Sequence, residues 1–385
     1  MSVGSALRSK ESVIKTIIGL NDAKAVKRYS GFLAVDVGRK SYFSKKFMGR
    51  GEEAQTPLQM LPNLENDAGE QITYDLVMQL RMQPIEGDNT LRGKEEDLKF
   101  FTDQIYIDQA RGGVNTGGRM TRKRTLHDLR KIARVRQSEW WARVFDELFY
   151  MYLSGARGIN ADMIYPTTYT GFANNAFVAP DAKHLLFGGA ATSKATLVAG
   201  DLMNVTLVER AQTQAQTMGG GIEGVPAIEA CEIDGESRYV IVMHPFQAYS
   251  MRTNVTAGQW LDIQKAAAAA EGRDNPIFKG ALGMVSDTIL QSHKGVIRFS
   301  DYGAGANLPA ARALFLGRQA GVVAFGSPGT NLRFDWNEES EDRGNQAVIT
   351  TASIFGIKKT AFTIDGVSRD FGVIALDTSA PNPNP

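Results

Sequence analysis

The sequence predicts an α+β protein with a glycine-bounded hairpin, one long helix and a mixed domain of buried strands. Two strand-like runs flank a polar, glycine-bounded stretch within residues 71–116. Apolar residues then recur at helical spacing over roughly 30 residues. Short β-branched runs alternate with helical patterns from about residue 200 onward. With 385 residues, the chain is long enough for two or three domains and a sizeable core.

Charge is segregated along the first third of the chain, although the whole sequence is nearly neutral, with 43 Lys+Arg and 42 Asp+Glu. Residues 1–50 hold 11 basic and 3 acidic side chains, residues 51–110 hold 4 and 13, and residues 119–136 hold 8 and 1. Like charges repel one another within a block, and the opposite charges of neighbouring blocks attract. The blocks are therefore typical of surfaces that contact a partner. The pattern favours an assembly protein whose blocks pair across copies or bind a polyanion.

Several classes of protein are disfavoured by the rest of the composition. The single cysteine, Cys231, cannot form an intramolecular disulfide. The N-terminus lacks the features of a signal peptide, and no run approaches the roughly 20 apolar residues that span a bilayer. We therefore expect a protein that is made in the cytoplasm and does not enter a membrane.

The first 110 residues predict an arm followed by a hairpin. Residues 1–70 mix basic side chains with short aromatic runs, so we expect an arm that packs on something else. Residues 71–80 and 98–107 are rich enough in β-branched and aromatic residues for two strands. A two-stranded hairpin is marginal in isolation, so we expect it to lie on a neighbour. The candidate inter-subunit residues of this hairpin are Glu86, Asp88, Glu95, Glu96 and Asp97.

The strongest helical pattern runs from about residue 121 to residue 152 and ends at Gly155. An aromatic cluster in its second half is interpreted as core rather than as a ligand site; its members are Trp140, Trp141, Phe145 and Phe149. The start of the helix is basic. A solvated face is the ordinary interpretation, and contact with phosphates or with the acidic segment 51–110 of another copy is the alternative. The candidate residues are Arg119, Arg122, Lys123, Arg124, Arg130, Lys131, Arg134 and Arg136.

Further helices and strands are expected along the rest of the chain. Residues 159–195 look like extended loop, and a helix is expected over residues 201–218. Residues 239–243 form a continuous apolar run, which is typical of a buried strand. The other expected elements are a helix that follows His244-Pro245, a helix over residues 260–270, and strands over residues 296–299, 313–316, 321–324, 331–336, 347–357 and 367–376.

No catalytic, cofactor-binding or metal-binding constellation is recognisable, so we predict a protein that is not an enzyme and needs no cofactor. Residues 219–224 have the letters of a dinucleotide fingerprint, but a helical pattern precedes them, which favours a loop. The four histidines and Cys231 lack the close spacing of a zinc site. Ser12 and Lys15 match a nucleophile pattern without its companion motifs.

A few stretches carry a resemblance to a known family. They are Leu-Phe-Leu-Gly-Arg-Gln-Ala-Gly-Val-Val-Ala-Phe-Gly at residues 314–326, His244-Pro245 with Gln247 and Trp260 downstream, and the paired runs around the long helix. Together with the order of the elements, they resemble the major capsid proteins of tailed bacteriophages with the Hong Kong 97-type fold. More specifically, they are similar to the N-four-like phage capsid family.

The resemblance implies a domain organisation. Its parts are an N-terminal arm (1–70), an extended loop hairpin (71–116), a peripheral domain with the long spine helix (117–199), an axial domain (200–330), strands that return to the peripheral domain (331–376) and a flexible tail (377–385). Glycines at both ends of the loop, Gly69 and those within residues 112–118, are expected to act as hinges. Lys94 and Lys99 lie in the loop, but nothing identifies a crosslinking partner, so no crosslink is predicted.

The resemblance also implies a function. Copies would form hexamers and pentamers of an icosahedral head around double-stranded DNA, which they would contact non-specifically. A separate scaffolding protein and a portal are expected partners, and a decoration protein is left open. The protein would belong to the virion after assembly in the host cytoplasm. Two alternatives stay open, namely an encapsulin-like shell protein of a cellular nanocompartment and a soluble enzyme with an unrecognised site.

Overall fold

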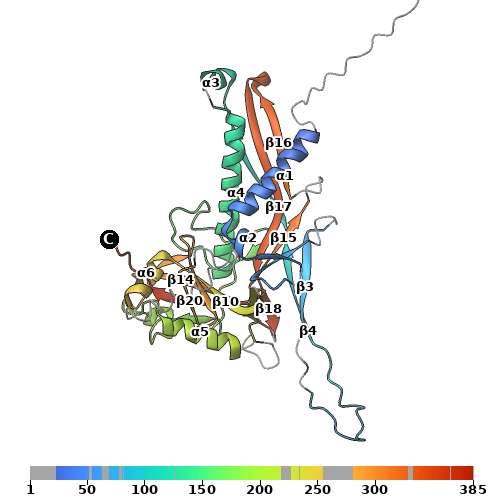
Figure 1. Cartoon of the computed structure of the whole chain (residues 1–385), viewed down its shortest axis with the longest axis vertical. Coiled ribbons are helices and arrows are strands. Elements are labelled where there is room, and N and C mark those ends of the chain that lie inside the picture. Colours follow the sequence, from blue (N-terminus) through green and yellow to red (C-terminus); the bar gives the residue numbers. More distant parts are fainter. Residues whose placement is uncertain are drawn as a thin grey trace, which may run out of the picture.

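The computed structural model of the chain describes residues 23–51, 54–62, 69–77, 80, 82–125, 127–217, 227–233, 235–254, 281–327, 333–364 and 366–384. Figure 1 shows an elongated molecule with two sheets and one hairpin that projects away from both. One sheet and the long helix form the upper part of the view, and the second sheet with its helices lies at the lower left. Four sequence features lie outside the described residues: Ser12 with Lys15, residues 219–224, Trp260 and the helix expected over residues 260–270.

The first sheet has six strands and is covered by helices from two distant parts of the sequence. Its strands are β1 (Met48–Arg50), β2 (Leu58–Leu61), β15 (Gly321–Gly326), β17 (Gln346–Lys359) and β16 (Phe334–Glu341), in that order, with β5 (Asp108–Asn115) also paired to β17. The helices are α1 (Ala23–Lys40), α2 (Tyr42–Lys46) and α4 (Leu129–Ser154). Strands β15 and β17 confirm the strands predicted over residues 321–324 and 347–357, and β16 begins three residues later than the strand predicted over residues 331–336.

The second sheet has eight strands and carries the most apolar runs of the sequence. Its main order is β11 (Gly283–Val285), β12 (Thr288–Ser292), β10 (Glu236–Met243), β14 (Leu308–Leu316), β20 (Val373–Ser379) and β8 (Leu185–Phe187). Strand β13 (Arg298–Tyr302) pairs with β14, and β9 (Cys231–Ile233) pairs with β10. Helices α5 (Val205–Thr217) and α6 (Pro245–Asn254) lie beside it (Figure 1). The buried strand expected over residues 239–243 is confirmed within β10.

The projecting hairpin consists of β3 (Gln71–Val77) and β4 (Phe100–Tyr106), paired from Gln71↔Tyr106 to Val77↔Phe100. Its base is fixed to a short hairpin of β18 (Ala361–Ile364) and β19 (Val367–Asp370) by a small apolar cluster, which contains Leu76, Phe362, Ile364 and Phe371. Lys358 and Tyr74 both donate hydrogen bonds to Asp103 at the same place. The body therefore holds the base of the hairpin, and the rest extends beyond it.

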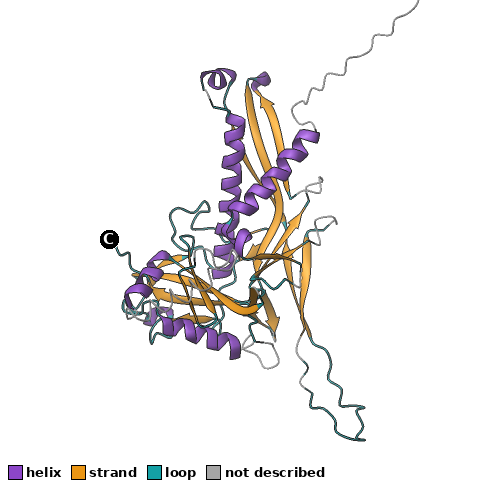
Figure 2. Cartoon of the chain, viewed as in Figure 1, coloured by secondary structure: helices purple, strands orange, loops and turns teal. Residues whose placement is uncertain are grey.

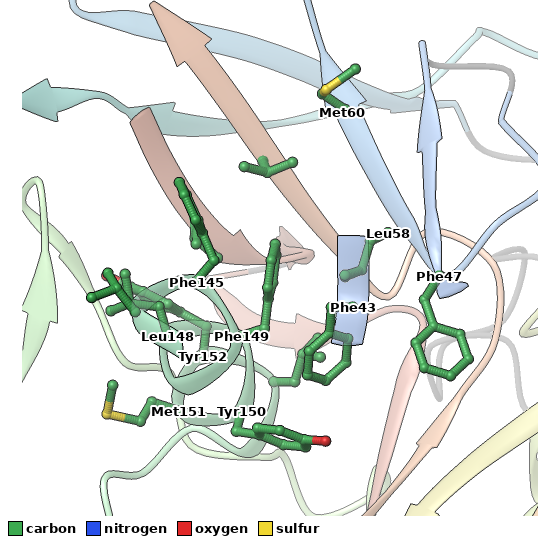
Figure 3. Close-up of a cluster of buried hydrophobic side chains, with 14 of the residues drawn as sticks. Phe43, Phe47, Leu58, Met60, Phe145, Leu148, Phe149, Tyr150, Met151 and Tyr152 are labelled. Atoms are coloured by element: carbon green, nitrogen blue, oxygen red, sulfur yellow. The ribbon is translucent and has the colours of Figure 1, made fainter. Parts of the chain in front are cut away.

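The second half of α4 forms the centre of the largest apolar core (Figure 3). Trp141, Phe145 and Phe149 are buried, which confirms that the aromatic cluster is core, while Trp140 is half-buried. Trp141 Nε1 donates a hydrogen bond of 2.8 Å to Thr351 Oγ1 on β17. Because this bond joins residues 210 positions apart, it ties the helix to the sheet.

The helix predicted as continuous from residue 121 is interrupted, so that prediction is wrong in its first turns. A short helix α3 (Arg119–Arg124) precedes α4, and Thr125, His127 and Asp128 between them belong to neither helix. Asp128 begins α4 because its carboxylate accepts hydrogen bonds from the backbone N–H groups of Arg130 (3.1 Å) and Lys131 (3.2 Å). Gly155, with φ of 68°, ends α4 as predicted.

Two further expectations are corrected by long-range packing. The described part of residues 1–70 is not an arm that packs on another molecule, since Leu33, Phe43 and Phe47 are fully buried in the core of their own chain. Gly112 is not a hinge, because it lies inside β5 and a Cβ there would stand 2.5 Å from the Trp140 ring. The close approach of the indole explains the glycine.

The remaining predicted elements are found with shifted ends. Helix α5 lies within the helix predicted over residues 201–218, β14 contains residues 313–316, and β13 overlaps residues 296–299. The strand predicted over residues 367–376 is two strands, β19 and β20, which belong to different sheets. The segment expected to be loop, residues 159–195, carries β8 and the two-residue strands β6 (Gly171–Phe172) and β7 (Asn175–Ala176).

Candidate assembly surfaces

The tip of the β3–β4 hairpin, residues 82–99, extends away from both sheets and contains no helix or strand (Figure 2). It carries all the acidic residues predicted to act between subunits. Glu86, Asp88, Glu95 and Asp97 are exposed, and Glu96 is partly exposed. Met82 N donates a hydrogen bond of 2.7 Å to Glu96 Oε2. The other predicted carboxylates thus face solvent in the single chain.

Backbone N–H groups shape the turn beside these carboxylates. Gly93 N donates a hydrogen bond of 2.5 Å to Glu95 Oε2. Bonds from the backbone N–H groups of Glu95 itself and of Gly93 lower the pKa of Glu95, because they favour its charged form. Glu95 is therefore ionised near neutral pH.

Apolar side chains are exposed along the same hairpin, which the sequence reasoning missed. The residues are Val77, Leu80, Met82, Leu91, Leu98 and Phe100. The exposed fraction reaches 58% for Leu98 and 56% for Phe100. Apolar residues within an otherwise polar stretch of sequence could have predicted this exposed apolar surface. A ribbon that exposes apolar side chains and unpaired strand edges is typical of a site of protein contact.

The basic residues at the start of α4 are partly neutralised by their own chain. Arg130 forms an ion pair of 2.7 Å with Glu338 on β16, and its guanidinium lies 4.9 Å from the centre of the Tyr29 ring. Trp336 Nε1 donates a second hydrogen bond, of 2.8 Å, to the same carboxylate oxygen of Glu338. Arg130 therefore joins α1, α4 and β16, and its role is at least partly structural.

The other predicted basic residues divide into two groups. Three have partners in the same chain: Arg119 Nε donates to Gly344 O (3.1 Å), Arg134 pairs with Asp36 (3.6 Å) and Arg136 pairs with Glu139 (2.7 Å). Lys123, Arg124 and Lys131 are exposed and form no ion pair within the described part of the chain. The side chain of Arg122 lies outside the described residues, although its backbone belongs to α3.

The basic and the acidic surfaces lie at opposite ends of the molecule (Figure 1). Helix α3 is at one end of the long axis, and the hairpin tip is at the other. One chain therefore cannot bring its own hairpin tip to its own α3. If these surfaces pair, they pair between copies.

Clusters of metal-ligating side chains and membrane-spanning helices were sought among the described residues. No group of three or more His, Cys, Asp or Glu side chains among them could hold a metal ion. None of the helices in the described ranges is both long and apolar enough to cross a membrane. His184 is engaged with Asp181, whose carboxylate oxygens lie 3.0 Å from Nδ1.

Comparison with known proteins gives concordant matches over nearly the whole chain. A family model described as phage capsid protein matches residues 17–382. The major capsid protein of Pseudomonas phage KPP25 is 26% identical over 372 residues, which cover 89% of this chain and 92% of that protein.

Solved structures match as well. The capsid of Ralstonia phage GP4 is 53% identical with a TM-score of 0.84, covering 96% of this chain and all of that chain. The cyanophage Pam1 capsid is 18% identical with a TM-score of 0.65, covering 98% of each chain, so it bears on the fold alone.

Proposed function

Because this chain belongs to the phage capsid protein family, we propose that it is a major capsid protein whose copies assemble into the shell of a phage head. The fold is the Hong Kong 97-type capsid fold that the sequence predicts, and these relatives do not favour a cellular compartment shell. The family is one of structural proteins, and the lack of enzymatic activity stays part of the proposal. So does the division into extended loop, peripheral domain and axial domain.

One observation supports assembly most directly, namely the projecting hairpin with its exposed apolar side chains. Burying apolar area stabilises a contact by about 25 cal/mol per Å². In the single chain the hairpin lacks this stabilisation, because Leu98 and Phe100 remain more than half exposed. Self-association through a heterologous contact would recover it, and a contact whose rotation closes gives rings such as hexamers and pentamers.

The acidic and basic surfaces would determine how the two copies are oriented in that contact. We propose that the acidic tip of one copy lies near the basic α3–α4 region of another, since opposite potentials favour one register over others. Lys123, Arg124 and Lys131 are suited to this role because they form no ion pair among the described residues of their own chain. If they face the lumen instead, they would contact the phosphates of packaged double-stranded DNA without base recognition.

The first test is a charge reversal at the hairpin tip, followed by electron microscopy and size-exclusion chromatography. Glu95→Lys, Glu96→Lys and Asp97→Lys together should reduce the yield of rings and shells, with little change in the melting temperature of the subunit. The matched variant Glu95→Gln, Glu96→Gln and Asp97→Asn should have a smaller effect, because it removes the attraction without adding repulsion. Equal assembly of the reversed variant would exclude pairing between subunits at this tip.

A second test separates the two roles of the basic residues. Replacing residues 122–124 with glutamine should lower the DNA retained in intact shells if α3 faces the lumen. Unchanged retention in intact shells would place α3 against protein. Co-expression with candidate scaffolding, portal and decoration proteins of the same phage would test these proposed partners in the virion.

A further inference from the structure

The hairpin joins the six-stranded sheet at a single residue, Ile107. Strand β4 ends at Tyr106 and pairs with β3, whereas β5 begins at Asp108 and pairs with β17. The backbone therefore changes partner strands within one residue. Gly356 of β17 lies against this junction, since a Cβ there would stand 2.0 Å from Tyr106 O. This is the point at which the hairpin leaves the body.

The side chain of Asn175 gives Tyr106 the hydrogen bonds that a neighbouring strand would give. Tyr106 N donates to Asn175 Oδ1 (3.0 Å), and Asn175 Nδ2 donates to Tyr106 O (2.8 Å). Paired residues of antiparallel strands exchange two hydrogen bonds in the same way. A side-chain amide can do this because it carries both an acceptor and a donor. Asn175 is only 3% exposed, so its amide is buried at the junction.

The turn between β6 and β7 places Asn175 beside Tyr106. Its two central residues, Ala173 and Asn174, have φ of 57° and 59°, which lie in the left-handed region. Asparagine tolerates this conformation, whereas alanine is strained in it. Gly171 is equally constrained, since a Cβ there would stand 2.1 Å from Asn175 O. Backbone strain of this kind persists only where surrounding contacts fix the conformation.

The same turn is anchored to α4 and to the sheet. The buried Tyr152 hydroxyl of α4 donates a hydrogen bond to Asn175 O (2.8 Å) and accepts one from Phe172 N (2.6 Å). The Phe172 ring stacks on the Phe355 ring of β17, with centroids 4.6 Å apart and planes at 19°. A continuous series of contacts therefore runs from α4 through Asn175 to the root of the hairpin.

Other contacts hold the hairpin in a different way. The apolar cluster around Leu76 and the hydrogen bonds to Asp103 attach its strands to the β17–β19 region. Apolar burial is not directional, whereas a hydrogen bond weakens steeply as its angle departs from the optimum. None of these contacts pairs the backbone of Tyr106, where the strand changes sheets. The two bonds to Asn175 restrain the angle at that position.

We propose that Asn175 is a positioning residue that sets the direction in which the hairpin leaves the body. This inference rests on the proposed function, in which the hairpin contacts a second copy. A segment that already points in the bound direction loses less freedom when the contact forms. Asn175 thus favours assembly without touching the neighbouring subunit.

Double electron–electron resonance on the unassembled full-length chain measures this direction. Spin labels at Val77→Cys, at the far end of the paired strands, and at Ile132→Cys, on α4, report where the hairpin lies relative to the helix. Both side chains are exposed, and Cys231 is buried, so labelling is confined to the introduced cysteines. With Asn175 in place, we expect one narrow distribution of distances.

Asn175→Asp keeps an acceptor for Tyr106 N but places a carboxylate oxygen against Tyr106 O. The population outside the native distance should rise about fivefold, which corresponds to about 1 kcal/mol for one hydrogen bond. Below the pH at which the new carboxyl group protonates, its O–H can donate to Tyr106 O, so the distribution should narrow again. Asn174→Asp makes the same change at the neighbouring exposed position and should leave the distribution unchanged at both pH values.

Electron microscopy of assembly gives the second measurement. Asn175→Asp should form fewer shells than Asn174→Asp at the pH where the new carboxyl group is ionised. Equal distance distributions in the two variants, or equal shell yields, overturn the proposal. If Asn175→Asp fails to fold, Tyr152→Phe removes the anchor of the turn, and an unchanged distribution in that variant overturns it. If the chain with Asn175 forms no shells, the proposed function fails, and the distances alone decide whether Asn175 positions the hairpin.

Discussion

The eight-stranded sheet and the projecting hairpin differ in where their apolar and charged side chains lie. The sheet buries them within the chain, and the hairpin exposes them to solvent. In the sheet, β20 is buried at every position and β14 is buried from Ala310 to Leu316. The buried charge of Arg312 is matched by Asp377 in the neighbouring strand, 2.7 Å away. In the hairpin, Leu98 and Phe100 face solvent beside the acidic tip. The first region buries its apolar side chains within one chain, whereas the second leaves apolar side chains exposed.

The Arg312–Asp377 pair shows how the buried charges of this sheet are satisfied within the chain. Arg312 donates from Nε and Nη2 to the two oxygens of Asp377, at 2.7 Å each, and from Nη1 to Ser154 O at 2.8 Å. Tyr302 donates a further hydrogen bond of 2.6 Å to Asp377. The pair therefore connects the sheet to the end of α4.

The largest effect is expected from breaking this pair. Arg312→Met leaves Asp377 buried without its cation, so the free energy of unfolding should fall by about 3–5 kcal/mol. Denaturant unfolding of the unassembled chain measures this change. As a control, Lys194→Met removes an exposed ion pair with Asp301 and should cost less than about 1 kcal/mol. Similar losses in the two variants would contradict the contrast between buried and exposed charge.

A pH effect of intermediate size is expected at the junction of α4 with the eight-stranded sheet. Burial lowers the pKa of His293 to about 4 from an unfolded value of 6.5. Between these values the unfolded chain binds the proton more strongly, so stability is complete above pH 6.5 and falls as the pH drops towards 4. The loss from this group is about 3 kcal/mol.

The variant His293→Phe isolates this contribution, because phenylalanine preserves the stack between Tyr42 and Tyr150 but cannot bind a proton. Its melting temperature should depend less on pH between 6.5 and 4 than that of the unsubstituted chain. His127→Phe changes an exposed histidine and should keep the original dependence. An unchanged pH profile in His293→Phe would assign the acid sensitivity to other groups.

The smallest effect compares two glycines that share a positive φ but differ in their surroundings. Gly155 has φ of +68°, and a Cβ there would stand 2.1 Å from Val178 O. Gly87, at the hairpin tip, has φ of +63° with nothing within 4 Å of the added atom. Gly155→Ala should cost about 2–3 kcal/mol, and Gly87→Ala about 1 kcal/mol, from backbone strain alone. Equal melting temperatures of the two variants would show that crowding at Gly155 is relieved without cost.

Much of the fold follows from patterns that are local in the sequence. The apolar run at residues 239–243 could only be buried, and it forms the centre of β10. The helical spacing of Trp141, Phe145 and Phe149 predicts the side of α4 that faces the core. The acidic block predicts an exposed hairpin tip, because a cluster of like charges is costly to bury. Each of these depends on neighbours within a few positions along the chain.

The sequence by itself determined the order of the elements, the segregation of charge and the absence of any recognisable catalytic motif. Only the tertiary structure decided which charges are available to a partner, because Arg130 meets Glu338 across 208 positions of sequence. It also decided why residue 112 is glycine and why the described part of the first 70 residues belongs to the core. The physical reason is that a pattern records a side chain and its near neighbours, whereas an ion pair or a close contact depends on distances that exist only after distant segments pack.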